Sequence, residues 1–199
     1  NNWMKKIFLL LIDDLCNFFR IIFFSLPGNL GIKFREYCLK VFYKNVENKI
    51  IIHSGCELKD LSNISFDGVI TFQKKCFVSA NDGNITIGNN THFNFELILI
   101  ADFGKIIIGK NCLIGPRVIF RSSNHKFEEK EKNIISQGHT ANQIILEDDI
   151  WIGAGAIILP GAHIKRGAVI AAGSVIRGVI EEFSVVSTVG ENKLIKKRI

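Results

Sequence analysis

Five histidines offer the side chains best suited to acid–base chemistry, because an unperturbed imidazole titrates near pH ~6.5. His125 lies in the polar stretch RSSNHKFEEKEKNIISQG, residues 121–138, whose flanks are rich in Ile and Gly. A neutral imidazole that is correctly oriented can act as a general base, which accelerates a reaction by roughly 10²–10⁴-fold. The other four histidines are His53, His92, His139 and His163.

The cysteines do not have the spacing of a metal or redox site. They stand at positions 16, 38, 56, 76 and 112, and no two of them form a CxxC pair. A zinc ribbon or a dithiol redox motif therefore has no support, and we expect no metal. An odd number of widely spaced cysteines is typical of reduced thiols in a cytoplasm.

Length and charge favour one domain with a small appendage. The chain has 199 residues, 47% of them hydrophobic, and a formal net charge of +6. We find no nucleic-acid motif and expect no nucleic-acid partner. The densest basic cluster is in the C-terminal tail, and we interpret it as a solvated terminus; it comprises Lys193, Lys196, Lys197 and Arg198.

The first 48 residues are expected to form an N-terminal helical segment, with one helix over 4–25 and a second over about 30–45. The stretch from Ile7 to Leu26 is strongly apolar, but Asp13, Asp14 and Arg20 interrupt it, which disfavours a membrane span. Residues 4–26 could instead lie in a membrane interface, or pack on the protein or a neighbouring subunit. We expect a cytoplasmic protein, with the cytoplasmic face of the inner membrane as the alternative location.

A six-residue repeat dominates the C-terminal part. Ile152, Ile158, Ile164, Ile170 and Ile176 are six apart, and a small residue follows each of the first four by four positions. Neither a helix nor a flat strand has this period. The simplest geometry is a coil with three short sides, which bury the Ile residues and turn at the small ones; glycines suited to those turns stand at 153, 155, 161, 167, 173 and 178.

Upstream, a looser copy repeats every 21 residues, so that VSANDGNITIGNNTHFN (78–94) matches LIADFGKIIIGKNCLIG (99–115). This internal repeat is the signature of a solenoid whose coils stack on one another. From Phe120 to Leu146 the hexads lose register, which predicts one extended loop over residues 121–145. Long loops in compact folds are commonly functional.

The repeats, the looped-out Asn124-His125 and the stretch DDIWIGAGAIILPGAHIKRGAVIAAGSVI resemble the hexapeptide-repeat acyltransferases over residues 50–195. The similar subgroup is the bacterial sugar O-acetyltransferases, including galactoside, maltose and polysaccharide enzymes. The resemblance implies an all-β solenoid over residues 49–199. This would be a left-handed parallel β-helix, usually a homotrimer with active sites between subunits.

The resemblance also assigns roles for an acetyl-CoA-dependent transfer to a carbohydrate acceptor. His125 matches the general base that deprotonates the acceptor hydroxyl. Asn94 and Asp102 match an acceptor-binding pair, and His92 matches an aromatic substrate contact. The residues expected along acetyl-CoA are Trp151, Gly153, Ala154, Ala172, Gly173 and Arg177, with a backbone N–H near Gly153 or Ala154 for the oxyanion.

Some features depart from the resemblance, and other functions stay open. Glu181 and Glu182 replace the usual two prolines of the tail, which affects the adenine end of the CoA site. The main alternative is N-acetylation of an amino sugar or a nucleotide-linked amino sugar. A γ-type carbonic anhydrase needs an H-x4-H pair that the chain lacks, and a non-catalytic solenoid would not need the loop with His125.

Overall fold

The computed structural model describes residues 24–42, 49–189 and 191–197. Most of the predicted first helix, the proposed membrane contact and Cys16 lie outside these residues. In the described part, no helix is both long and apolar enough to cross a membrane.

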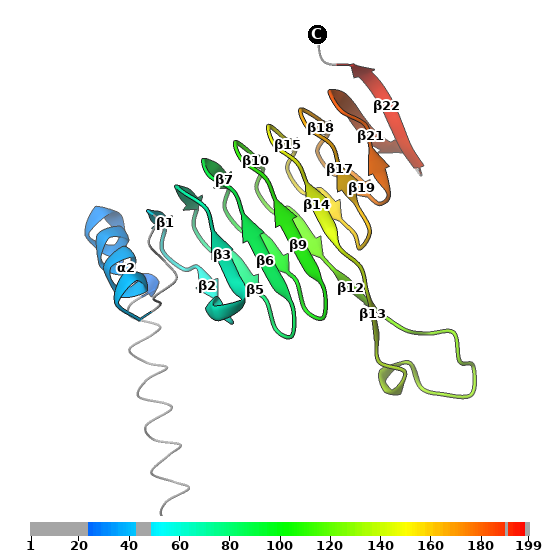
Figure 1. Ribbon diagram of the computed structural model, residues 1–199, viewed down its shortest axis with the longest axis horizontal. Coiled ribbons are helices and arrows are strands. Elements are labelled where there is room, and N and C mark those ends of the chain that lie inside the picture. The colour runs from blue at the N-terminus through cyan, green and yellow to red at the C-terminus, as the bar shows by residue number, and fades with distance from the viewer. Residues whose placement is uncertain (1–23, 43–48, 190, 198–199) are drawn as a thin grey trace, which may run out of the picture.

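The second predicted helix is present as α2, Gly28–Phe42, and it packs beside the first strand of the solenoid (Figure 1). It begins two residues before the predicted start, and the last three residues of the predicted helix, 43–45, lie outside the described residues. Its Arg35 side chain is fully buried. Arg35 Nε donates to the Ile52 carbonyl at 2.8 Å and Nη1 donates to the Leu26 carbonyl at 2.8 Å, so this side chain ties the helix to the first coil.

From Ile50 onward the chain forms a parallel β-helix with three walls, called sheets A, B and C here, as the sequence predicts. Figure 1 shows the coils stacked side by side. Sheet A contains β1 (Ile50–Ile52), β4 (Ile70–Phe72), β7 (Thr91–Phe93), β10 (Leu113–Ile114), β15 (Trp151–Ile152), β18 (Val169–Ile170), β21 (Ser184–Val189) and β22 (Glu191–Lys197). Strand β22 is antiparallel to β21.

Sheet B contains β2 (Glu57–Leu58), β5 (Phe77–Ser79), β8 (Ile98–Ile100), β11 (Ile119–Arg121), β16 (Ile157–Ile158) and β19 (Val175–Ile176). Sheet C contains β3 (Ile64–Phe66), β6 (Asn84–Ile87), β9 (Lys105–Ile108), β14 (Ile144–Leu146), β17 (His163–Ile164) and β20 (Val179–Ile180). A short 3-10 helix, η1 (Leu61–Asn63), precedes β3. Successive coils pair in register, residue above residue.

The core lies inside the coil, and the hexads fill it as predicted. The five Ile residues from Ile152 to Ile176 are all fully buried, and so are the small residues Ala156, Ala162, Ala168 and Ser174. In the upstream coils buried aromatic rings join the aliphatic core. Phe72 and Phe93 stack with ring centroids 4.8 Å apart and an interplanar angle of 7°.

Glycines serve two purposes at the turns. Gly155, Gly161, Gly167, Gly173 and Gly178 have positive φ, as the turn interpretation requires. Gly153 does not, and its role is close packing instead, because a Cβ there would lie 2.5 Å from the Ala172 nitrogen. In the upstream coils, residues that are not glycine take positive φ at the corner after sheet A; these are Lys75, Glu96 and Arg117.

The stacked phenylalanines should dominate the stability of the upstream coils. We expect Phe93→Ala to lower the free energy of unfolding by about 3–5 kcal/mol, because it removes a buried ring and leaves a cavity. Denaturant unfolding followed by circular dichroism measures this. Phe127→Ala is the matched control, since that ring is 69% exposed and its loss should cost little. Equal effects of the two variants would contradict this view of the core.

Candidate functional site

The predicted extended loop leaves the wall between sheets B and C. After β11 the chain runs out as β12 (Ser123–His125), passes the short 3-10 helix η2 (Ile134–Ser136) and returns as β13 (His139–Ala141) to enter β14 (Figure 1). The two arms pair antiparallel, with His125 opposite His139. We call the turns that join sheet B to sheet C the B–C corner and those that join sheet A to sheet B the A–B corner.

A stack of three rings holds the exposed His125 side chain. The His125 ring centroid lies 4.3 Å from that of His139, at an interplanar angle of 41°. The His139 ring in turn stacks on Phe103, with centroids 4.7 Å apart. Phe103 belongs to the B–C corner of the preceding coil, so the stack fastens the loop to the solenoid.

Asp102 lies at the same corner, next to the base of the loop. Its Oδ1 accepts a hydrogen bond from Ser79 Oγ at 3.1 Å. Its carbonyl accepts one from Ser122 Oγ at 3.3 Å, and Ser122 is three residues before His125. The structure therefore brings Asp102 to the same part of the molecule as the predicted base.

Asn94 and His92 lie elsewhere, so the predicted acceptor-binding pair is not together in one protomer. Asn94 is at the A–B corner, and its Oδ1 accepts a hydrogen bond from the Phe95 N–H at 2.8 Å. The whole of β8 separates it from Asp102. His92 is exposed on β7 of sheet A, with Nε2 3.2 Å from Asn90 Oδ1.

Most residues expected to contact acetyl-CoA gather on the side of sheet A and the A–B corner. Trp151 is on the outer face of β15, with 55% of its surface exposed. Gly153, Ala154, Ala172 and Gly173 occupy the A–B corners of two consecutive coils, where Gly173 N–H donates to the Ala154 carbonyl at 2.8 Å. An extended ligand such as the pantetheine arm of acetyl-CoA would contact only small side chains and backbone at these corners.

Arg177 is the exception among these residues. It is exposed at the B–C corner between β19 and β20, away from the other predicted CoA contacts. Glu181, which replaces a usual tail proline, forms an ion pair with Lys165; the distance from Lys165 Nζ to Glu181 Oε2 is 2.7 Å.

One expected role needs a correction. The Gly153 N–H already donates to the Ile170 carbonyl at 2.7 Å, so it is committed to the ladder between coils and cannot bind an oxyanion. The Ala154 N–H donates no hydrogen bond within the described residues. Ala154 therefore remains the candidate of the two.

The predicted residues thus form two groups in one protomer. Asp102, His125 and Arg177 belong to the B–C corner. The other group is on sheet A and the A–B corner, and it contains His92, Asn94, Trp151, Gly153, Ala154, Ala172 and Gly173. One copy of the chain does not assemble all of the residues that the sequence singles out.

His163 and Glu147 form a separate contact, away from both groups. His163 is half-buried, and its Nε2 lies 2.9 Å from Glu147 Oε1. The Arg166 N–H, which donates to the other oxygen of Glu147, lowers the pKa of that carboxyl. Among the residues that the structure describes, no three His, Cys, Asp or Glu side chains gather in a way that could hold a metal.

Two family descriptions match this chain. The bacterial transferase hexapeptide (six repeats) matches residues 144–178, and the hexapeptide repeat of succinyl-transferase matches residues 105–120. These two stretches of the chain therefore carry repeats similar to those of the hexapeptide transferases. The matched ranges cover β9 to β11 and β14 to β19, the coils on either side of the loop that carries His125.

Curated relatives point the same way. The galactoside O-acetyltransferase of Lactococcus lactis is 32% identical over 52% of this chain and 51% of its own length, so the chain spans about half of that relative. A relative in Escherichia coli, WbbJ, is named for O-acetyl transfer in lipopolysaccharide biosynthesis. It is 29% identical over 92% of this chain and 89% of its own.

Among solved structures, the N-acyltransferase AntD of Bacillus cereus has a TM-score of 0.71 to this chain, with 20% identity over 83% of this chain and 89% of its own. It was solved with coenzyme A and dTDP-4-amino-4,6-dideoxyglucose. At that identity the likeness shows the fold alone.

Sequence reasoning located His125 but missed the partners of its ring. The sequence assigns no role to His139 or to Phe103. The antiparallel pairing of two arms of similar length is the signal that could have placed His139 opposite His125. Phe103 has no such signal, because its contact with His139 depends on how the loop folds back over the preceding coil.

The ring stack predicts that Phe103 controls the order of the loop. We expect Phe103→Ala to speed amide hydrogen exchange in residues 123–125 and 139–141, because the stack loses its contact with the solenoid. Hydrogen-exchange mass spectrometry measures this. Phe95→Ala is the control. Phe95 is about as exposed as Phe103 (44% and 47%), but it lies at the A–B corner, away from the loop. Unchanged exchange in the Phe103 variant would show that the stack does not fasten the loop.

Proposed function

We propose that the protein is an acetyl-CoA-dependent O-acetyltransferase that acetylates a sugar hydroxyl. The observation that carries the proposal is His125, an exposed imidazole held by the ring stack beside Asp102 at the only long loop of the described solenoid. The names of the two curated relatives support sugar O-acetylation.

In the proposed reaction His125 acts as the general base. A nitrogen of its ring takes the proton of the acceptor hydroxyl while that oxygen attacks the thioester carbonyl of acetyl-CoA. The tetrahedral intermediate collapses, the C–S bond breaks, and the CoA thiolate takes up the proton that the imidazole carries. The backbone N–H of Ala154 is the candidate donor to the oxyanion.

A glycan of the bacterial surface, or its precursor, is the proposed acceptor. The name of the relative WbbJ, which aligns with 92% of this chain, is the main support. We also propose a cytoplasmic location, where thiols stay reduced. The four described cysteines are free, and burial raises the pKa of the Cys112 thiol to about 11, which keeps it protonated and unreactive.

The proposed assembly is a homotrimer whose active sites lie between subunits. The division of the predicted residues into two groups supports this, because a second copy can bring its sheet A and A–B corner against the B–C corner of the first. Apolar side chains on the outer walls also support it. Leu113 and Trp151 are in register on sheet A, each 55% exposed, and Ile98 and Val175 on sheet B are more than one-third exposed.

N-acetylation of an amino sugar is the second candidate. The fold of AntD, solved with an amino-sugar nucleotide, favours it. An amine acceptor would need the same base to take its proton. Mild base treatment of the product separates the two reactions, because it cleaves an acetyl ester and leaves an acetamide intact.

The proposed base can be tested by substitution. We expect His125→Gln to lower the rate of acetyl transfer by roughly 10²–10⁴-fold, because proton removal from the acceptor loses its catalyst. The assay measures CoA release from acetyl-CoA in the presence of a panel of galactosides and amino sugars. His163→Gln is the control, since that ring lies on β17 of sheet C and its Nε2 contacts Glu147. Full activity of His125→Gln would refute the assignment.

The shared site predicts complementation between two inactive variants. His125→Gln removes the base, and Ala172→Trp fills the A–B corner where acetyl-CoA is expected. If each site takes its base from one subunit and its CoA contacts from the next, co-expression should restore about one quarter of the sites in a closed ring. Differently tagged copies and tandem purification isolate the mixed oligomers. No recovery in those oligomers would mean that one protomer supplies both groups.

A further inference from the structure

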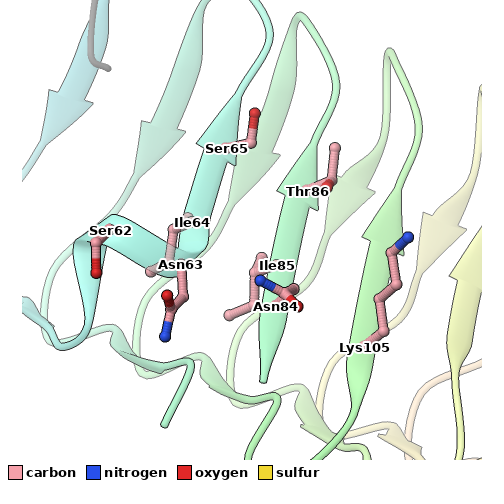
Figure 2. A pocket seen from close by; sticks show the side chains of 8 residues that line it. All are labelled: Ser62, Asn63, Ile64, Ser65, Asn84, Ile85, Thr86 and Lys105. Atoms are coloured by element: carbon pink, nitrogen blue, oxygen red, sulfur yellow. The ribbon is translucent and has the colours of Figure 1, made fainter. Parts of the chain in front are cut away.

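A shallow pocket of about 390 Å³ opens on the outer face of sheet C, near its edge at the B–C corner. Figure 2 shows its lining on η1 and the three neighbouring strands β3, β6 and β9. Neither the proposed chemistry nor the resemblance assigns a role to it. The lining residues are Ser62, Asn63, Ile64, Ser65, Asn84, Ile85, Thr86 and Lys105.

The lining is polar, carries one cation and contains no acidic residue. The register of the strands arranges it in two rows. Ser65 pairs with Thr86 in one row, and Asn84 pairs with Lys105 in the other. Because neighbouring strands are roughly 5 Å apart, hydroxyl, amide and ammonium groups are presented at regular intervals along the wall.

Four of these side chains have hydrogen-bonding capacity to spare. Within the described residues, Ser65, Asn84, Thr86 and Lys105 make no side-chain hydrogen bond and no ion pair. Three exposed lysines elsewhere are ion-paired instead: Lys110 with Asp67, Lys132 with Glu129 and Lys165 with Glu181. The positive charge of Lys105 is therefore available to a ligand.

The pocket adjoins the candidate site. Lys105 follows Asp102 by three residues, and both belong to the coil that precedes the loop with His125. The row of Asn84 and Lys105 continues to Gln143, which directly precedes Ile144, the partner of Ile106 in the next coil. Gln143 is where the loop rejoins the wall. A polar row thus connects the pocket with the base of the loop.

We infer that this pocket is a distal acceptor subsite that binds an anionic sugar, one that bears a phosphate or a carboxylate. The amide and hydroxyls suit the hydroxyl groups of a sugar ring, which donate and accept hydrogen bonds. The ammonium of Lys105 suits a phosphate or carboxylate oxygen through a charge-assisted hydrogen bond. The inference rests on the proposed function for one point only, namely that the bound sugar is part of the acceptor.

Binding can be tested without any transfer reaction. The full-length protein is titrated with glucose 1-phosphate, glucuronic acid, glucose and inorganic phosphate while amide shifts are recorded by TROSY NMR. We expect the two anionic sugars to shift the amides of Ser65, Asn84, Thr86 and Lys105 with saturation. Glucose and inorganic phosphate alone should bind more weakly, because each supplies only half of the contacts.

Two variants localise the charge contact. Lys105→Gln should weaken binding of both anionic sugars by about three- to tenfold, because an exposed charge-assisted contact is lost. Lys74→Gln removes the same charge from the exposed A–B corner and should leave the affinity unchanged. Equal affinity of the Lys105 variant and the wild type would overturn the inference, and so would shifts confined to residues away from sheet C.

The experiments distinguish failure of the subsite from failure of the proposed acetyltransferase function. Binding at Lys105 together with absent acetyl transfer would retain the anionic-sugar site and reject the transferase. Transfer without binding at this pocket would retain the transferase and overturn the subsite. For an active enzyme, Lys105→Gln should raise KM for an acceptor that bears phosphate or carboxylate and leave kcat unchanged.

Discussion

The in-register stacking of short parallel strands is the constraint on which the rest of this structure depends. Each coil donates and accepts its backbone hydrogen bonds through its neighbours, and each inward side chain sits above its counterpart in the previous coil. A wall built in this way commits its N–H groups, as the Gly153 N–H bound to Ile170 illustrates. Groups that bind or catalyse must therefore lie at corners, on outward side chains or in segments that leave the wall.

This chain departs from the strict repeat at one corner in particular. Ile164 follows Ile158 by six residues, but Ile108 follows Leu99 by nine, and Leu146 follows Phe120 by 26. Each of these intervals crosses the B–C corner. The same corner carries Asp102, Phe103 and the loop with His125, and the lengthened upstream strands β6 and β9 line the pocket beside it. Insertions at one corner leave the stacking of the other two corners intact.

The fold could be predicted from the sequence because a six-residue repeat of buried residues indicates a three-sided coil directly. The buried Ile and Ala residues of the C-terminal hexads, and the point at which the loop leaves, follow from spacing alone. The surroundings of His125 could not be predicted, because the contact between Phe103 and His139 joins two segments with no shared period. Gly153 was misjudged for a related reason: sequence alone does not distinguish a glycine needed for positive φ from one needed for close packing.

The separation of the predicted residues into two groups follows from the same geometry. Asn94 and Asp102 are eight residues apart in sequence, yet a sheet B strand between them places them at different corners of the coil. A rigid wall cannot fold back on itself to unite those corners, since every coil is held by the next. The B–C corner offers an imidazole and polar side chains, whereas sheet A and the A–B corner offer small residues and an exposed Trp151. In the proposed trimer these two surfaces would meet across the interface between copies, and the site would be complete only in the assembly.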